Sequence, residues 1–280
     1  MKLLIIGGHG MAGHMLRDYF ARQHDYEVWT TVRSADPSDT GALSLDVRND
    51  EHLRHLLNQI KPDAVINAAG LLNEEARTRQ AEAIYVNSLF PHQLAMYAEQ
   101  YLFRLFHIST DCVFSGSRGD YTEWDPTDAL SVYGKSKSLG EVYSPNAVTI
   151  RTSIIGPELK QSGIGLFHWF MQQKGDIQGY RRVFWNGVTT LELAKAIEWC
   201  FHHPIHGLVH LAGQPKLSKY ELLLMLQQQF HHDAITIHYN DDMKSDKSLV
   251  STRADFTYPV SSYPQMIADL HAWMNQHQPH

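Results

Sequence analysis

The sequence predicts an α/β protein built on a doubly wound parallel sheet, followed by a smaller α/β region. Short apolar runs such as Leu3–Ile6 and Ala64–Ile66 recur through the first half, as expected of parallel strands buried on both faces. Helical patterns separate them; Leu53, Leu56, Leu57 and Ile60, for example, follow the spacing of one helix face. Six βα-like units extend from Met1 to about Ile155, and such alternation is typical of a parallel sheet with helices on both faces.

The N-terminal segment carries the first motif. A strand ending at Ile6 runs directly into Gly7-Gly-His-Gly-Met-Ala-Gly13, and a helix follows. Glycines let backbone N–H groups approach a pyrophosphate, and the helix N-terminus adds favourable partial charge. Three glycines alone also suit an ordinary tight turn, but their place directly after an apolar strand favours a Rossmann-like dinucleotide site. We assign to it Gly7, His9, Gly10, Met11 and Gly13.

The end of the second predicted strand, Tyr26–Val32, bears on the choice of cofactor. An acid at this place holds the adenosine ribose hydroxyls and favours NAD. This chain instead has Arg33 and Ser34, which can bind a 2′-phosphate. We therefore expect NADP(H) to be favoured over NAD(H); the alternative is a solvated arginine that follows a strand.

Further strand ends add to the predicted cofactor site. A short third strand over 43–47 would bring Asp46 and Val47 near the adenine. The strand Asp63–Asn67 ends in Ala68, Ala69 and Gly70, whose small size allows a flat ring to approach or, alternatively, the next helix to pack. A long helix over 80–100 carries Asn87, which we also assign to the cofactor site, and Pro91, which should kink the helix.

The stretch His107–Glu141 contains the predicted catalytic groups. A buried strand over 105–108 runs into Ser109-Thr-Asp-Cys-Val-Phe, and Tyr133-Gly-Lys-Ser-Lys137 follows after a polar loop. Four residues make about one helical turn, so Tyr133 and Lys137 share a face. A phenol beside an ammonium, opposite a hydroxyl at a strand end, can donate a proton; the alternative is a chance Tyr-x-x-x-Lys on an exposed helix.

The second half shows no site motif of its own. We place a cofactor-binding domain at 1–155 and a mainly substrate-binding region at 156–280, with segments at about 180–200 that can pack back on the first domain. Helices are expected over 166–173, 193–201 and 220–230 and near the C-terminus, with a strand over 208–212. A glycine-rich connection over 174–179 and a polar loop over 244–253 complete the expected elements.

Composition limits the classes of function. A chain of 280 residues with 43% hydrophobic residues can bury a large core. A formal charge of −6 argues against broad binding to nucleic acid or anionic membranes. Two cysteines form neither a disulfide framework nor a zinc pattern, and the histidine pairs lack partners at helical spacing, so we expect no metal. No apolar run is long enough to span a membrane, and a cytoplasmic protein is expected.

Together the glycine loop, Ser109-Thr-Asp-Cys-Val-Phe and Tyr133-x-x-x-Lys137 resemble the extended short-chain dehydrogenase/reductase family. Ser-Thr-Asp-x-Val-Phe-x-Gly with Val132-Tyr-Gly-Lys-Ser-Lys137 is similar to its dTDP-4-dehydrorhamnose reductase branch. Segments at 186–194 and 251–255 match that branch in place, so the resemblance covers essentially the whole chain. It implies reduction by NAD(P)H of the 4-keto group of a nucleotide-diphospho-sugar, a 4-keto-6-deoxy sugar of deoxysugar or polysaccharide biosynthesis.

The resemblance also implies roles for the site residues. Tyr133 would give a proton to the ketone oxygen, and the Lys137 ammonium, which favours a phenolate, would lower its pKa and bind the nicotinamide ribose. Thr110 would hold the carbonyl oxygen, whereas Ser109 should face the other side of its strand. By position alone, Arg151, Asn186 and Thr189 are substrate-binding candidates.

Cys112 leaves alternatives open. It stands where rhamnose-type reductases carry Tyr, and the second acid of the dehydratases is missing, which argues against 4,6-dehydration. GDP-fucose synthase has a catalytic Cys two residues after its Ser/Thr, as Cys112 follows Thr110, so an epimerase or epimerase-reductase is an alternative; His168 is the nearest candidate for its histidine acid. A catalytically silent NADP-binding regulatory protein is a further alternative, which retention of Thr110, Tyr133 and Lys137 argues against. The nucleotide, the sugar, the product stereochemistry and the oligomeric state, with a homodimer one alternative, stay open.

Overall fold

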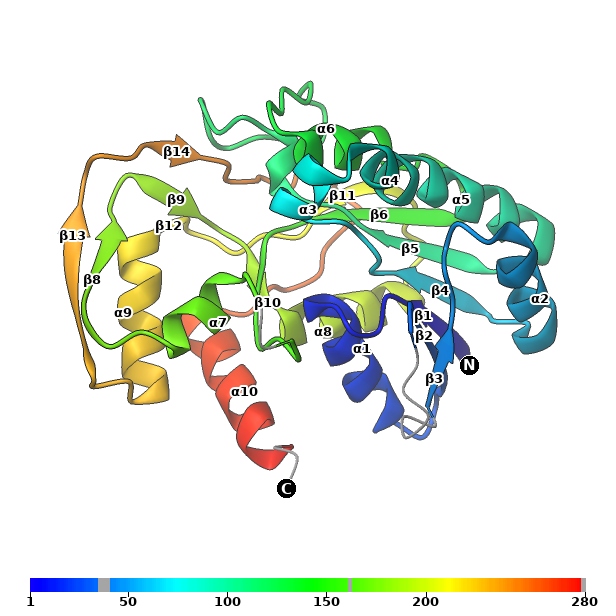
Figure 1. Cartoon of the computed structure of the whole chain (residues 1–280), viewed down its shortest axis with the longest axis horizontal. Coiled ribbons are helices and arrows are strands. Elements are labelled where there is room, and N and C mark those ends of the chain that lie inside the picture. The colour runs from blue at the N-terminus through cyan, green and yellow to red at the C-terminus, as the bar shows by residue number, and fades with distance from the viewer. Residues whose placement is uncertain (35–40, 161–162, 278–280) are drawn as a thin grey trace.

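The protein is organised around one seven-stranded parallel sheet with the strand order β11-β6-β5-β4-β1-β2-β3 (Figure 1). The structure is a computed structural model that describes residues 1–34, 41–160 and 163–277. The order reverses beside β1, which is the arrangement of a doubly wound fold, and the predicted fold class is confirmed. The strands are β1 (Lys2–Ile6), β2 (Glu27–Val32), β3 (Ala42–Ser44), β4 (Ala64–Asn67), β5 (Arg104–Ile108), β6 (Ala147–Arg151) and β11 (Gly207–His210).

Alternate residues of β1 enter two separate cores, which explains why the strand is apolar throughout. Leu3 and Ile5 pack with α1 (Met11–Ala21) and α8 (Thr190–Phe201) on one face. Leu4 and Ile6 pack with α2 (Asp50–Ile60) and α5 (Phe90–Tyr101) on the other face. Figure 1 shows α1 and α8 on one side of the sheet and α5 with α6 (Val132–Leu139) on the other.

The helix expected over 80–100 is interrupted beside Pro91. Its pieces are α4 (Gln80–Ile84), a π-helical turn over Tyr85–Leu89, and α5, in whose first turn Pro91 lies. Proline has no N–H to donate to the carbonyl four residues earlier, here that of Asn87. A Cβ atom on Gly140 would lie 1.9 Å from this carbonyl oxygen, so only glycine lets the end of α6 approach so closely.

The second half of the chain returns to the sheet before it forms its own small layers. The strand expected near 208–212 is β11, which pairs with β6, and α8 packs against α1. Outside the main sheet, β7 (Ile154–Ile155) pairs with β10 (Val188–Thr189), and β9 (Val183–Trp185) pairs with both β12 (Leu217–Ser218) and β14 (Ser245–Asp246). The remaining helices are α3 (Asn73–Thr78), α7 (Leu166–Met171), α9 (Lys219–Phe230) and α10 (Tyr263–Gln276).

Two expectations for this half were wrong. The segment expected as a glycine-rich connection is strand β8 (Gly175–Tyr180), which pairs in parallel with β13 (Ile235–Asn240). Its Gly179 fits because a Cβ there would come within 2.8 Å of the Tyr220 ring. The segment expected as a polar loop contains β14. No helix within the described ranges is long and apolar enough to cross a membrane.

Candidate active site

The glycine loop is shaped as a cradle at the carboxyl end of β1. Gly7 has a φ of +93°, and the N–H groups of Gly7 and Gly8 both donate to the carbonyl oxygen of Thr31. A Cβ on Gly13 would lie 2.1 Å from the Gly7 carbonyl oxygen, so α1 begins directly against the loop. Gly10 caps α1 without a side-chain hydrogen bond, and the first turn contains no acid. The open N-terminus therefore suits the pyrophosphate of a dinucleotide.

A cavity of about 320 Å³ brings most of the predicted cofactor residues together. Lys160, which the sequence analysis did not select, also lines it. Met11 and Gly13 do not line it: Gly13 lies against the Gly7 carbonyl oxygen, and a Cβ on Gly165 would meet the terminal methyl of Met11 at 2.3 Å. The predicted residues that line the cavity are Gly7, His9, Gly10, Arg33, Ser34, Asp46, Val47, Ala68, Ala69 and Gly70.

The end of the cavity beside β2 carries charges of both signs. Arg33 is 58% exposed, and its guanidinium lies 3.6 Å from a carboxylate oxygen of Glu82. Asp46 forms an ion pair with Arg48, whose hydrogen bond lowers the pKa of Asp46 to about 2. Among the described residues this exposed guanidinium has one long ion-pair contact, and such a group can bind a phosphate.

Strand alternation separates Ser109 from Thr110 at the end of β5. Ser109 donates from Oγ to Glu141 Oε1 at 2.8 Å, on the side expected for a structural residue. Thr110 caps the short turn Asp111–Val113; its Oγ1 accepts from the N–H of Cys112 at 3.1 Å and donates to Asp111 Oδ1 at 3.1 Å. The Thr110 hydroxyl is thereby held at the strand end.

Helix α6 brings Tyr133 to this turn. Ser131 caps α6 by accepting from the N–H of Gly134 at 3.0 Å. A Cβ on Gly134 would lie 2.1 Å from the Cys112 carbonyl oxygen, so the helix can start directly over the turn. Burial raises the pKa of Tyr133, and a hydrogen bond with Thr110 acts in the opposite direction. The Tyr133 phenol therefore lies close to Thr110, and burial favours its protonated form.

Lys137 is directed at the strand rather than at the phenol. Its Nζ donates to the Ile108 carbonyl oxygen at 2.6 Å and lies 3.4 Å from Nε2 of His107. Burial lowers the pKa of Lys137 to about 8, while the charge of Glu141 raises it. The expectation that Lys137 lowers the pKa of Tyr133 is not met, because burial dominates the environment of the phenol.

Asn87 supports the site from behind instead of lining the cavity. Its side chain is fully buried and exchanges two hydrogen bonds of 2.9 Å with the backbone of Leu71. It also donates to Ser136 Oγ at 3.0 Å, and Ser88 Oγ donates to the Ser136 carbonyl oxygen at 2.8 Å. Asn87 thus connects the turn after β4 to the helix that carries Tyr133.

Two lysines of the second half, which the sequence analysis missed, face the strand end. Lys247 donates from Nζ to Sγ of Cys112 at 3.6 Å. Lys219, the first residue of α9, lies with its Nζ 5.4 Å from the centre of the Trp185 ring. Burial raises the pKa of Asp111, while the charges of both lysines lower it. Neither lysine forms an ion pair within the described part of the chain.

Pairing between distant segments positions Lys247. Tyr121 N donates to the Ser248 carbonyl oxygen, and Val250 N donates to that of Tyr121. Lys216 bridges Asp120 and Asp246, at 2.8 Å from each. The loop after Thr110 is in this way joined to the segment around Lys247. No local motif accompanies such pairing, which explains why sequence inspection did not find it.

Cys112 itself is a poor base. Burial raises the pKa of its thiol to about 11, and the charge of Asp111 acts in the same direction. A protonated thiol does not abstract a proton from a sugar carbon. His168, the candidate acid partner, has its Nε2 2.8 Å from the Gln172 amide nitrogen, one turn on in the sequence.

The three substrate candidates chosen by position are bound to protein groups. Arg151 is 2% exposed and forms a bidentate ion pair with Glu141, both contacts at 2.6 Å. Asn186 pairs through its amide with both backbone groups of Leu249. Thr189 caps α8 by accepting from the N–H of Glu192. All three side chains stabilise the fold around the site.

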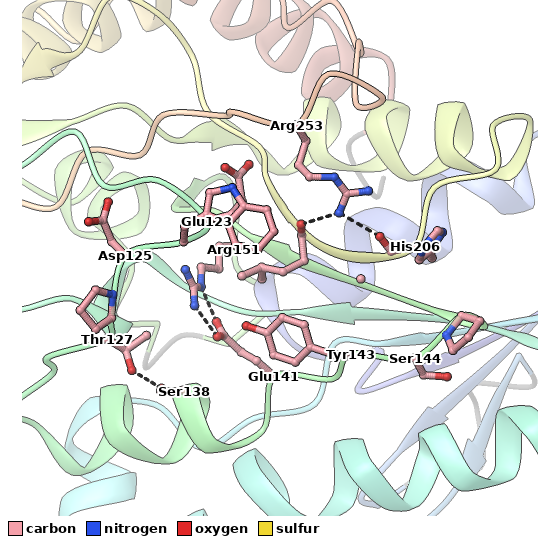
Figure 2. A pocket seen from close by; sticks show the side chains of 15 residues that line it. Glu123, Asp125, Thr127, Ser138, Glu141, Tyr143, Ser144, Arg151, His206 and Arg253 are labelled. Carbon is pink, nitrogen blue, oxygen red and sulfur yellow. Dashed lines mark hydrogen bonds and ion pairs between the residues drawn. The ribbon is translucent and has the colours of Figure 1, made fainter.

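A second cavity, of about 630 Å³, lies over β6 and β11 on the α6 side of the sheet. Figure 2 shows Arg151 and Glu141 paired across its floor, with Arg253 directed at backbone oxygens near His206. Glu123 accepts from the N–H groups of His210 and Thr252 and from the Thr252 hydroxyl. Since these charged groups satisfy one another, the cavity presents no buried charge that a ligand must neutralise. Nor do the described residues include a cluster of three acids, histidines or cysteines able to hold a metal.

The strand order, the glycine cradle and the Thr110, Tyr133 and Lys137 arrangement define a protein of the extended short-chain dehydrogenase/reductase class. A family model described as RmlD substrate binding domain matches residues 1–248, and the chain belongs to that family.

Known proteins resemble this chain in sequence or, for the solved structure below, in fold. Spore coat polysaccharide biosynthesis protein SpsK of Bacillus subtilis (strain 168) is 25% identical over 81% of this chain and 79% of its own length. A dTDP-4-dehydrorhamnose reductase of Aggregatibacter actinomycetemcomitans is 34% identical over 54% of this chain and 51% of its own length. The solved structure of dTDP-4-dehydrorhamnose reductase from Bacillus anthracis str. Ames in complex with NADP has a TM-score of 0.79 and 17% identity, over 97% and 99% of the two chains.

We predict that Arg151→Met lowers the stability of the protein. The substitution leaves the Glu141 carboxylate buried without its partner, which costs about 3–5 kcal/mol of unfolding free energy. Urea unfolding at pH 7 measures the change. Arg77→Met is the control, because Arg77 and Glu74 pair on the surface with 68% of each side chain exposed; it should leave the midpoint nearly unchanged. Equal stability of Arg151→Met and wild type would contradict the structural role.

Proposed function

We propose that the protein uses NADP(H) to reduce the 4-keto group of a nucleotide-activated 4-keto-6-deoxy sugar in deoxysugar or polysaccharide biosynthesis. The observation that carries this proposal is that Thr110, at the carboxyl end of β5, lies on the same edge of the sheet as the glycine cradle after β1. Helix α6 packs over the turn that Thr110 caps and carries both Tyr133 and Lys137. The 34% identical dTDP-4-dehydrorhamnose reductase of Aggregatibacter actinomycetemcomitans supports the substrate class.

In this proposal the two hydroxyl-bearing residues, Thr110 and Tyr133, have defined tasks. NADPH bound in the cradle would supply the hydride for the carbonyl carbon. The Thr110 hydroxyl orients the carbonyl oxygen, for which its proton turns from Asp111 to the substrate. Tyr133 gives the phenolic proton to that oxygen as the hydride arrives, so the ketone becomes a neutral alcohol. The raised pKa of Tyr133 keeps its proton in place until the substrate carries negative charge.

The second half supports an anionic substrate. Lys219 and Lys247 present ammonium groups to the strand end, where the sugar would lie. A nucleotide-linked sugar carries a diphosphate directly beyond the sugar ring, and cations near it favour binding.

The preference for NADP(H) has a separate basis. Arg33 and Ser34 line the cavity at the end of β2, where a 2′-phosphate would lie. The Bacillus anthracis reductase of similar fold was solved in complex with NADP. The domain boundary near 155 and a homodimeric state stay predictions from the sequence.

We predict that Tyr133→Phe lowers kcat for ketone reduction by about 10²–10⁴-fold, the usual contribution of a positioned general acid. NADPH binding should change little, because the phenyl ring keeps the packing of Tyr133 against the apolar cluster that includes Leu71 and Val86. Steady-state kinetics with a nucleotide 4-keto-6-deoxy sugar give kcat, and fluorescence titration with NADPH gives the affinity for the cofactor. Tyr143→Phe, an exposed phenol outside the site, is the control. Unchanged turnover in Tyr133→Phe would remove Tyr133 as the acid.

We predict that Arg33→Ala weakens NADPH binding roughly 10–100-fold, the loss expected for one or two charge-assisted hydrogen bonds. NADH binding should stay nearly constant, since NADH has no 2′-phosphate. Calorimetric titration of both cofactors measures the difference. Arg54→Ala, an exposed arginine on α2 outside the cavity, should affect neither. Parallel losses for NADPH and NADH would contradict phosphate recognition by Arg33.

We predict that Cys112→Ser retains ketone reduction within a few-fold of wild type. The wild-type product formed in deuterium oxide should carry no solvent deuterium at C3 or C5, because the raised pKa keeps the thiol protonated. NMR of the product locates any deuterium. Deuterium that appears with the wild type and disappears with Cys112→Ser would identify an epimerase-reductase.

A further inference from the structure

Three polar side chains form a buried chain beneath α6. Asn67 on β4 and His107 on β5 are register partners on neighbouring strands, and neither is exposed to solvent. Lys137 reaches down from α6 and is 4% exposed. They share the apolar face of the sheet that packs against α5 and α6. Polar groups in such a core must satisfy one another.

The hydrogen bonds of Asn67 fix where the proton of His107 lies. Oδ1 of Asn67 accepts from the N–H of Ala69 at 3.2 Å, so its Nδ2 faces Nδ1 of His107, at 3.1 Å. An amide nitrogen donates and does not accept, so Nδ1 must offer its lone pair. Burial lowers the pKa of His107 well below its ordinary value, and the ring is neutral. Its single proton is therefore on Nε2.

This proton is directed at Lys137. Nε2 of His107 lies 3.4 Å from Nζ of Lys137. An ammonium group has three donors and no lone pair, whereas a neutral amine can accept the Nε2 proton. The imidazole therefore opposes the charged form of the lysine.

The other groups around Lys137 also influence whether its amine is charged. The Ile108 carbonyl oxygen accepts from Nζ at 2.6 Å in either protonation state. Glu141, one turn later, favours the ammonium, but its carboxylate is already bonded to Arg151 and Ser109. Tyr133 lies one turn earlier and is neutral, and His92 bonds to the Leu139 carbonyl oxygen at the end of α6. None of these groups cancels the combined effect of burial and the His107 Nε2–H donor, both of which disfavour the charged form of Lys137.

We propose that Asn67 and His107 are positioning residues that hold the Lys137 side chain at the strand end and favour its uncharged amine. The inference rests on the proposed function only in naming Lys137 as the reductase lysine. Burial lowers the pKa of Lys137 to about 8, and the hydrogen-bonded chain from Asn67 through His107 acts in the same direction. A lysine is charged below its pKa, so an activity that needs the ammonium falls as pH rises through about 8. Because Ala69 lines the cofactor cavity, the chain also links that cavity to Lys137.

The test reverses the direction of the hydrogen bond between residue 67 and Nδ1 of His107 with an isosteric substitution. In Asn67→Asp an acceptor replaces the donor that faces Nδ1, so a proton moves to Nδ1 and Nε2 can accept from an ammonium. The new carboxylate charge acts in the same direction. His107→Gln is a second, uncharged variant, whose amide oxygen can accept from Lys137.

The measurement is NMR and requires no turnover. Protein labelled at lysine ¹³Cε is titrated with pH, the Lys137 signal being assigned with Lys137→Met. ¹⁵N-histidine spectra give the tautomer of His107. We expect the Nε2–H tautomer and a lysine titration near pH 8 in the wild type. We expect that titration to rise by at least one pH unit in Asn67→Asp and in His107→Gln.

Thr149→Val is the matched control. Thr149 is the register partner of His107 on β6 and is equally buried. Within the described part of the chain its hydroxyl bonds only to the backbone of Val142. The Thr149→Val protein should be less stable than wild type, but its Lys137 titration should not shift. An equal shift in Thr149→Val would mean that loosened packing, and not the tautomer, sets the titration.

Other outcomes also overturn the proposal. These are an Nδ1–H tautomer in the wild type, a wild-type lysine titration near 10.5, or an unchanged titration in both variants. Where Asn67→Asp does not fold, the wild-type tautomer and His107→Gln decide. The NMR result stands even if the protein reduces no 4-keto sugar, so failure of the proposed function is distinguishable. If that function holds, the basic limb of the kcat profile moves to higher pH in Asn67→Asp.

Discussion

The active site depends on how closely α6 lies against the backbone of its neighbours. Three contacts with carbonyl oxygens set this distance along one helix. Gly134 leaves room for the Cys112 carbonyl, Lys137 donates to the Ile108 carbonyl, and Gly140 leaves room for the Asn87 carbonyl that Pro91 cannot bond. Two glycines and one lysine therefore hold Tyr133 over the end of β5. The same closeness buries Lys137, which explains why its charge is costly there.

The opposite side of the β5 end is held by charge. Ser109 faces away from Thr110 and bonds to Glu141, which pairs with Arg151 on β6, and Arg151 in turn contacts His210 on β11. A buried ion pair of this kind adds little net stability, but each ion needs its partner, because either charge buried alone would destabilise the fold. Because adjacent residues of a strand point to opposite faces, one dipeptide supplies an anchor on one face and a catalytic hydroxyl on the other.

The sequence was sufficient wherever a function depended on neighbours in the chain. The strands of the main sheet and the glycine cradle follow from local patterns. It was insufficient where long-range pairing decided the outcome. Lys247 reaches Cys112 only because the loop at Tyr121 pairs with Leu249, and Arg151, chosen by position, faces Glu141 instead of a ligand. The strand β8 was missed because its partner, β13, lies far along the chain.

The catalytic motif and its protonation states are specified by different parts of the sequence. Tyr133 and Lys137 suggest by spacing alone that an ammonium lowers the pKa of a phenol, yet burial raises that pKa and Lys137 faces β5. The side chain next to the Lys137 amine is His107, and Asn67 on the neighbouring strand fixes the position of the His107 proton. Neither residue belongs to the motif, and their effect arises from the register of β4 with β5. A motif of this class therefore identifies which groups can transfer a proton, while the strands beneath it determine the pH at which they do so.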